Sequence, residues 1–258
     1  MLELIAELTR LYLLEDQQCE GRPVTPAWLE QQLRGETCLA LDMVSGAGMT
    51  RTLVLRFDGA QAGKGDQQWE ALCAIANALQ NQLDLPAPAV SISGSDGFIL
   101  WLSLASPVPA AQARRFVTLL SAAHAPDGAI HASAAEKLPE ATALPPCLHP
   151  VSHKWAAFIH PGMGTSFAAE PGLDMAPPLA AQAGFLASLT SITPAQFARA
   201  LDALEQSHGN AAQAVPPSPQ PSQQGLLLKD ATLDDIVTFL HQKNIEPTFR
   251  YLIEPSRK

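Results

Sequence analysis

A β-hairpin is predicted by the residues Val90-Ser91-Ile92-Ser93-Gly94-Ser95-Asp96-Gly97-Phe98-Ile99-Leu100-Trp101-Leu102-Ser103-Leu104. Apolar residues alternate with serines before the central glycines, and the alternation resumes after them, which is typical of two strands joined by a tight turn. The turn, Ser93-Gly94-Ser95-Asp96-Gly97, is of a kind that brings backbone close to a ligand or to another strand.

A second strand is predicted upstream, in Thr52-Leu53-Val54-Leu55-Arg56-Phe57-Asp58-Gly59. It is apolar for most of its length and ends on a carboxylate followed by a glycine. An apolar strand that carries a carboxylate to its end, beside a glycine turn, is the layout of a metal-dependent nucleotidyl-transfer site. The two segments together give the first indication of function.

The order of these motifs resembles the catalytic core of the archaeo-eukaryotic primase (primase-polymerase) superfamily, nearest to its members from bacterial mobile elements. In that family one strand carries Asp-x-Asp, a hairpin carries Ser-Gly-x-x-Gly-x-His, and a later strand carries a third acid. The resemblance covers residues 25 to 205. It implies an α+β fold, with a primase-polymerase-like (RRM-like) antiparallel sheet core, flanking helices and a small helical C-terminal segment.

Several catalytic positions of that family hold other residues in this chain. Arg56 replaces the first acid of Asp-x-Asp, and Asp58 stands at the second. Ile99 replaces the hairpin histidine, and His131 is the nearest match to the third acid. The resemblance therefore implies the fold and argues against the activity, with Arg56, Asp58, Ile99 and His131 as a degenerate catalytic set.

The chemistry of this set leads to the same expectation. Two-metal phosphoryl transfer needs carboxylates that hold Mg²⁺ or Mn²⁺ ions about 3.5–4 Å apart, and Mg²⁺ prefers oxygen ligands. Arg56 repels a cation, and Asp58 alone would hold a hydrated ion only weakly. We expect no cofactor, or Mg²⁺ or Mn²⁺ if Asp96 supplies a replacement acid and the site is active.

The resemblance also implies residues that bind a nucleotide or nucleic acid. Related primases contact phosphates through the hairpin turn, an arginine on the next helix and a Pro-x-x-x-His segment. The matching residues here are Ser93, Gly94, Ser95, Gly97, Arg114, Arg115, His149 and Lys154. For Arg114 and Arg115 the alternative is a solvated helix face.

The histidines in this region could also bind zinc. Cys147, His149, His153 and His160 are potential ligands that lie close together in the sequence. Their spacing matches no standard structural zinc pattern. We therefore expect turn or surface histidines here, without zinc.

The composition favours an acidic protein of the cytoplasm. The net charge is −9 and the pI about 5.2, whereas proteins that grip nucleic acid nonspecifically usually carry a basic surplus. The four cysteines form no CxxC pair, which predicts free thiols. We expect no signal peptide and no membrane span, because the chain starts with an acidic helix and has no apolar run of sufficient length.

The remaining pattern predicts helices and strands around the two motifs. We expect a strand at 38–43 that forms a hairpin with the Asp58 strand, a β pair at 144–150 and 155–159, and a loop over 161–178. Expected helices are 1–18, 25–34, 69–83, 110–123, 179–190 and 194–207.

Three regions follow from this reading of the chain. Residues 1–207 form the primase-polymerase-like domain with its N-terminal helices, and residues 208–225 form a linker rich in Pro, Gln and Ser. Residues 226–258 contain a short amphipathic helix that cannot bury much surface alone. We expect it to dock on a partner, the alternative being that it packs back on the main domain.

The sequence thus favours a non-catalytic, primase-like subunit in the replication or maintenance of a mobile element. It would bind a nucleotide or single-stranded or primed DNA, or act as a scaffold for a helicase, polymerase or other replication factor. Two alternatives stay open: an active metal-dependent primase or DNA polymerase with a rearranged site, and a pure protein-interaction module.

Overall fold

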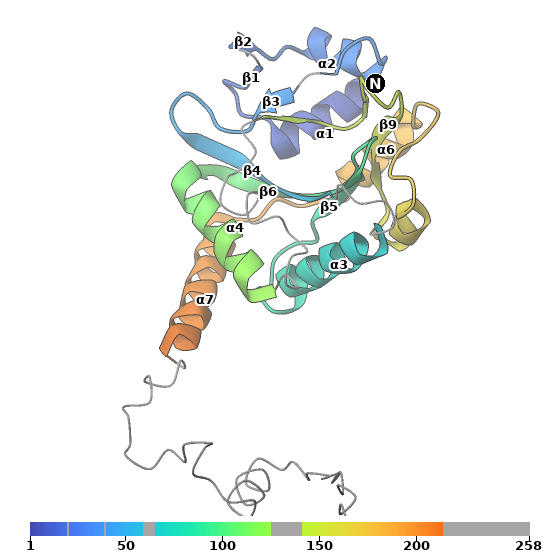
Figure 1. Cartoon of the computed structure of the whole chain (residues 1–258). Coiled ribbons are helices and arrows are strands. Elements are labelled where there is room, and N and C mark those ends of the chain that lie inside the picture. The colour runs from blue at the N-terminus through green and yellow to red at the C-terminus, as the bar shows by residue number, and fades with distance from the viewer. Residues whose placement is uncertain (20, 39, 59–64, 125–140, 214–258) are drawn as a thin grey trace, which may run out of the picture. The chain divides into compact units, whose positions relative to one another are not determined.

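Helices cover both faces of a five-stranded antiparallel sheet, which makes the protein a mixed α+β structure (Figure 1). The computed structural model describes residues 1–19, 21–38, 40–58, 65–124 and 141–213. Residues Met1–Ala211 form one unit, and Ala212–Lys258, nearly all of it outside the described residues, forms another. None of the helices in the described ranges is long and apolar enough to cross a membrane.

The predicted hairpin lies in the middle of the sheet. The strands are ordered β4 (Met49–Asp58), β6 (Gly97–Pro109), β5 (Ala89–Ile92), β9 (Trp155–Ile159) and β8 (Cys147–Leu148). Val90 pairs with Leu100 across the hairpin, as the alternation predicts. The β8–β9 pair is also confirmed.

One face of the sheet packs against α3 (Gly65–Asn81), α4 (Ala110–His124) and α7 (Pro194–Gln213). Apolar residues recur in these helices at three- and four-residue spacing, which places them on one side of each helix. The buried side chains of this layer include Leu55, Phe57, Leu72, Ile75, Leu79, Phe98, Leu100, Phe116 and Phe197. The expected helices at 69–83, 110–123 and 194–207 are therefore confirmed.

The opposite face packs against α1 (Leu2–Tyr12), α2 (Pro26–Leu33) and α6 (Leu179–Ala187). Helix α2 begins as predicted, because the Thr25 hydroxyl accepts a hydrogen bond from the Trp28 amide and Pro26 occupies the first turn. The buried side chains of this layer include Leu4, Leu8, Leu11, Leu33, Val54, Ile99, Trp101, Phe158 and Leu186.

The prediction that residues 38–43 form a hairpin with the Asp58 strand is wrong. Strand β3 (Ala40–Asp42) pairs with β7 (Ala141–Ala143), in a separate two-stranded sheet. Its backbone also accepts hydrogen bonds from side chains of the preceding segment, since Cys19 Sγ donates to Ala40 O and Gln17 Nε2 to Asp42 O. Leu41 is buried in the same apolar cluster as the residues of α1.

Other boundaries also differ from the predictions. Helix α1 ends at Tyr12 and is followed by a two-stranded ribbon, β1 (Gln18–Cys19) and β2 (Arg22–Pro23). The expected loop after His160 begins with a 3-10 helix, η1 (Pro161–Phe167). Helix α7 continues beyond residue 207 to Gln213. The rest of the predicted linker and the segment 226–258 lie outside the described residues.

Candidate functional site

The turn between β5 and β6 is organised around one hydroxyl oxygen. Ser93 Oγ accepts hydrogen bonds from the backbone amides of Ser95, Asp96 and Gly97 at 3.0–3.1 Å. The Ser93 amide in turn donates to the Gly97 carbonyl, which closes the turn. Backbone amides that converge in this way form a concavity suited to an anion. In this structure the Ser93 hydroxyl satisfies them.

Gly94 fixes this turn against a second turn at residues 149–154. The Gly94 amide donates to the Pro171 carbonyl, and its own carbonyl accepts from Ser152 Oγ. Its φ of 78° is in the left-handed region, and a Cβ there would lie 3.0 Å from the Ala156 amide nitrogen and the Lys154 carbonyl oxygen. Glycine is therefore required both for conformation and for space.

His149 lies in this second turn with a defined orientation. Its Nδ1 accepts a hydrogen bond from the Ser152 amide at 3.2 Å. A nitrogen that accepts from an amide carries no proton, so a neutral His149 carries its proton on Nε2. The ring is half-buried. His149 can thus offer one N–H donor beside the Ser93–Gly97 turn.

Lys154 is held by two acidic side chains. It forms ion pairs with Glu170 and, at 3.4 Å, with Asp174. The hydrogen bond to Glu170, followed by the hydrogen bond to Asp174, raises the pKa of the Lys154 ammonium above its usual value. The ammonium is charged at neutral pH, but the two carboxylates offset that charge. A ligand phosphate would compete with them for Lys154.

Three of the degenerate catalytic positions, Arg56, Asp58 and Ile99, lie at the same end of the paired strands β4 and β6. Arg56 is opposite Ile99 in the β4–β6 register, and Asp58 is opposite Gly97 at the start of the turn. Residues that are directly opposite on antiparallel strands point to the same face. Ile99 is 4% exposed and belongs to the apolar cluster under α1 and α2, while Arg56 is half-buried. His131 lies outside the described residues.

Arg114 and Arg115 are not brought to the turn. Helix α4 begins where the Ala110 amide donates to the Gly48 carbonyl, beside the start of β4. Asp58 and Gly97 lie at the other end of these strands. Arg115 instead forms an ion pair with Glu205 of α7, and both arginines are exposed. Arg114 and Arg115 therefore lie on an exposed helix face away from the hairpin turn, and their predicted role in binding stays a prediction.

The potential zinc ligands have other partners. Cys38 and burial raise the pKa of the Cys147 thiol, and His160 Nδ1 accepts a hydrogen bond from the Gly162 amide. Asp96, the potential replacement acid, is exposed and accepts a hydrogen bond from Ser95 Oγ at 2.7 Å. Within the described ranges, no group of three or more His, Cys, Asp or Glu residues is placed to hold a metal ion.

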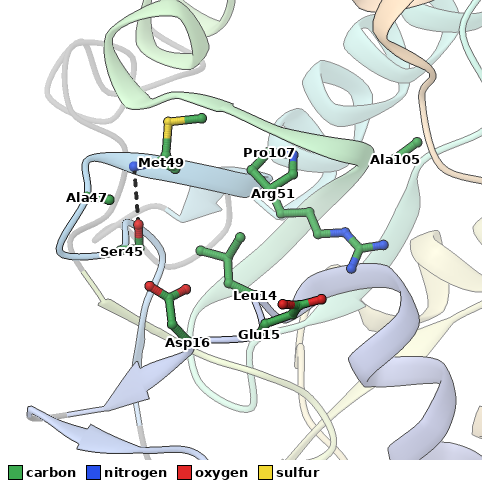
Figure 2. A pocket seen from close by; sticks show the side chains of 9 residues that line it. All are labelled: Leu14, Glu15, Asp16, Ser45, Ala47, Met49, Arg51, Ala105 and Pro107. Carbon is green, nitrogen blue, oxygen red and sulfur yellow. Dashed lines mark hydrogen bonds between the residues drawn. The ribbon is translucent and has the colours of Figure 1, made fainter.

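An open cleft at the opposite end of β4 was not predicted from the sequence (Figure 2). Its volume is about 490 Å³, and its lining includes Glu15, Asp16, Ser45, Met49 and Arg51. Burial, and to a lesser degree the nearby Arg10, lowers the pKa of the Arg51 guanidinium. Arg51, a basic residue within an apolar strand, is the signal in the sequence that could have revealed this cleft.

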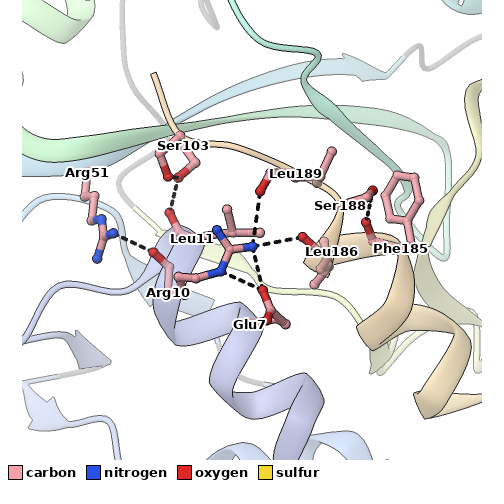
Figure 3. Close-up of polar contacts among 10 residues, drawn as sticks. Glu7, Arg10, Leu11, Arg51, Ser103, Phe185, Leu186, Ser188 and Leu189 are labelled. Carbon is pink, nitrogen blue, oxygen red and sulfur yellow. Dashed lines mark hydrogen bonds and ion pairs between the residues drawn. The ribbon is translucent and has the colours of Figure 1, made fainter. Parts of the chain in front are cut away.

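Arg51 is used to hold the end of a helix. It donates to the carbonyls of Arg10, Leu13 and Leu104, and Figure 3 shows the bond to Arg10. Ser103 Oγ donates to the carbonyl of Leu11 in the same turn of α1. The last carbonyls of a helix have no partner within the helix. The sheet therefore caps the C-terminus of α1, and Arg51 is a structural residue in this arrangement.

No family model matches the chain, and a search of curated proteins gives no match.

Proposed function

We propose that this chain is a non-catalytic, primase-like subunit that binds a nucleotide or nucleic-acid strand at the Ser93–Gly97 turn and acts as a platform for a replication partner. One observation carries the proposal. The turn and the segment with His149 and Lys154 contact each other directly, through Ser152 Oγ and Gly94, although they are far apart in sequence. These are the residues that the family resemblance implies for phosphate contacts.

The loss of catalysis is supported by the residues opposite each other in β4 and β6. Arg56 and Ile99 point to the same face, and Ile99 is buried among apolar side chains. A cation brought to this place would meet a guanidinium and an alkyl group in place of carboxylate oxygens. Among the described side chains, Arg56 and Ile99 supply no ligands for two-metal phosphoryl transfer.

The binding we propose is weak and local. The donors are the Nε2–H of His149 and the ammonium of Lys154, which Glu170 and Asp174 partly neutralise. The turn amides already donate to the Ser93 hydroxyl, so a phosphate would have to displace that hydroxyl to reach them. An overall charge of −9 adds long-range repulsion for a polyanion. Because one partly neutralised cation neutralises few phosphates, and because salt also screens the repulsion, affinity for DNA should fall only modestly as salt is added.

Binding of labelled single-stranded and primed DNA at low salt, measured by fluorescence anisotropy, tests the proposal. Lys154→Ala should weaken binding several-fold, because it removes the cation beside the turn. Arg199→Ala is the matched control, since Arg199 is an exposed cation on α7 outside the candidate site. Equal binding by Lys154→Ala, Arg199→Ala and the unchanged protein would place the contact elsewhere.

Gly94→Ala tests the turn itself. The added Cβ would sit 3.0 Å from backbone atoms of Lys154 and Ala156 and would be strained at a positive φ. We expect the turn to separate from the 149–154 segment and both DNA and nucleotide binding to fall. Gly184→Ala is the control, because a Cβ at Gly184 meets nothing within 4 Å.

A protein-interaction module is the second candidate, and a specific observation favours it. Val151, Met163 and Met175 are 81%, 52% and 79% exposed, and all three lie in the segments that follow β8 and β9. A protein-docking surface is typically a contiguous patch of exposed apolar side chains, and these three residues are the candidates to form one. Absence of any nucleotide or DNA binding at low salt would favour this candidate over the first.

A further inference from the structure

Two of the four cysteines lie against each other in the layer under α2. Cys38 and Cys147 are close enough for each thiol to shift the pKa of the other, and neither cysteine is in a disulfide. Cys147 is in β8 and is buried, whereas Cys38 follows α2 and is half-buried. Cys38 is therefore the member of the pair that a small reagent can reach.

The surrounding packing holds these two segments together. Gln32 Nε2 at the end of α2 donates to the Leu144 carbonyl, just before β8. A Cβ at Gly35 would lie 2.9 Å from the Trp155 ring and 3.6 Å from Leu148 Cβ, so the backbone after α2 lies close against β8 and β9. The contact between Cys38 and Cys147 is thus part of a packed interface.

The two thiols are chemically unequal. The hydrogen bond from Cys147 lowers the pKa of the Cys38 thiol and raises the pKa of Cys147 further above its usual range. A thiolate is the reactive form of cysteine. The other thiols differ, since Cys19 donates to the Ala40 carbonyl, and burial raises the pKa of Cys73.

We propose that Cys38 and Cys147 are a redox site that forms a reversible disulfide, with a peroxide as the oxidant. The Cys38 thiolate attacks a peroxide oxygen, the O–O bond breaks, and water leaves after taking up a proton. The resulting Cys38 sulfenic acid is then attacked by the Cys147 sulfur: the S–S bond forms, the S–O bond breaks, and a second water leaves. The two sulfurs together lose two electrons to the peroxide, and a dithiol reductant reverses the change.

The disulfide would link the segment after α2 to β8, which leads directly into the 149–154 turn. Closing a long loop stabilises the folded state by restricting the unfolded chain. The oxidised protein should therefore melt at a higher temperature than the reduced one. This inference does not depend on the proposed binding function, because its readouts are thiol content, linkage and melting temperature.

Treatment of the full-length protein with hydrogen peroxide tests the inference. Thiol titration in denaturant should fall from four free thiols to two, and a non-reducing peptide map should contain the Cys38–Cys147 linked peptide. Dithiothreitol should restore all four thiols. Cys73→Ser is the matched control and should keep the linked peptide, whereas Cys38→Ser should abolish it.

Two outcomes would overturn the inference. One is a linked peptide that contains Cys19 or Cys73 in place of the predicted pair. The other is a Cys38 that stays reduced, or that is converted to sulfinic acid, while Cys147 remains a free thiol. Because a substitution at buried Cys147 can impair folding, alkylation rates of the unchanged protein provide a second measurement: Cys38 should react faster than Cys73.

Discussion

The two faces of the sheet differ in what they bury. The face under α3, α4 and α7 buries apolar strand residues such as Phe57 and Leu100. The face under α1, α2 and α6 buries polar strand residues as well. On this second face, which we call the mixed face, Ser91 Oγ accepts from Trp101 Nε1 at 2.8 Å. Thr52 Oγ1 donates to the Tyr12 carbonyl, and Ser103 Oγ donates to the Leu11 carbonyl. We call the first face the apolar face.

The difference shows how the same sheet holds its two helix layers in different ways. Apolar burial is non-directional and grows with the area removed from water. Side-chain hydrogen bonds to helix carbonyls are directional, so the mixed face fixes where α1 ends and how α6 sits. Loss of one partner on that face leaves a buried polar group unsatisfied. The two faces should therefore respond to different kinds of substitution.

The largest effect is expected for Phe116→Ala on the apolar face. Phe116 is fully buried, and its ring lies 5.1 Å from that of Phe197. Removal of a buried aromatic ring should lower the free energy of unfolding by about 3–5 kcal/mol. Urea denaturation measures it, with Phe116→Leu as the milder control. A loss no larger than that of the control would contradict the tight packing of this face.

Gln182→Ala should be the most damaging polar substitution on the mixed face. The Gln182 amide donates to the Phe158 carbonyl and accepts from the Phe158 amide, both at 2.9 Å, and so ties α6 to β9. Two buried backbone groups would lose their partner, which should cost about 2–4 kcal/mol in the same measurement. Gln80→Ala, on the exposed side of α3, should change stability by less than about 0.5 kcal/mol.

Ser91→Ala should have a smaller effect on the same face. It removes the acceptor of the buried Trp101 N–H, and the expected loss is roughly 1–2 kcal/mol. A double-mutant cycle with Trp101→Phe isolates the hydrogen bond from the packing of the ring. Additive losses would show that the bond does not contribute, and would weaken the contrast between the two faces.

The smallest effect is expected for Arg115→Ala, at the outer surface of the helices on the apolar face. Its ion pair with Glu205 joins α4 to α7, and the Arg115 side chain is 60% exposed. Exposed ion pairs are worth about 0–1 kcal/mol. Urea denaturation should therefore give nearly unchanged stability. A loss comparable to that of Phe116→Ala would mean that charge holds this layer.

The sequence predicted the hairpin and most helices because their patterns are local. It did not predict that Ser91 and Ser103 are buried, since serines that alternate with apolar residues usually mark a solvent-facing side. They are buried because helices cover both faces of β5 and β6. The pairing of β3 with β7 was also missed, because the two strands are about a hundred residues apart. Neither segment has a sequence pattern that predicts which strand it pairs with.

The candidate site, like the fold, was predictable only in part from the sequence. The resemblance brought the Ser93–Gly97 turn and the His149–Lys154 segment together in expectation, and the structure places them in contact. The ion pairs of Lys154 with Glu170 and of Arg115 with Glu205 depend on how distant segments pack. Charge at these positions is visible in the sequence, whereas its neutralisation is not.

We propose that the protein is a binding platform without metal-dependent chemistry. Calorimetric titration with a nucleoside triphosphate, with and without Mn²⁺, tests it most directly in the unchanged protein and in Asp58→Ala. We predict nucleotide binding that is the same with and without Mn²⁺ and is unaffected by Asp58→Ala. Binding that requires Mn²⁺ and is lost in Asp58→Ala would contradict the account and indicate a working nucleotidyl-transfer site.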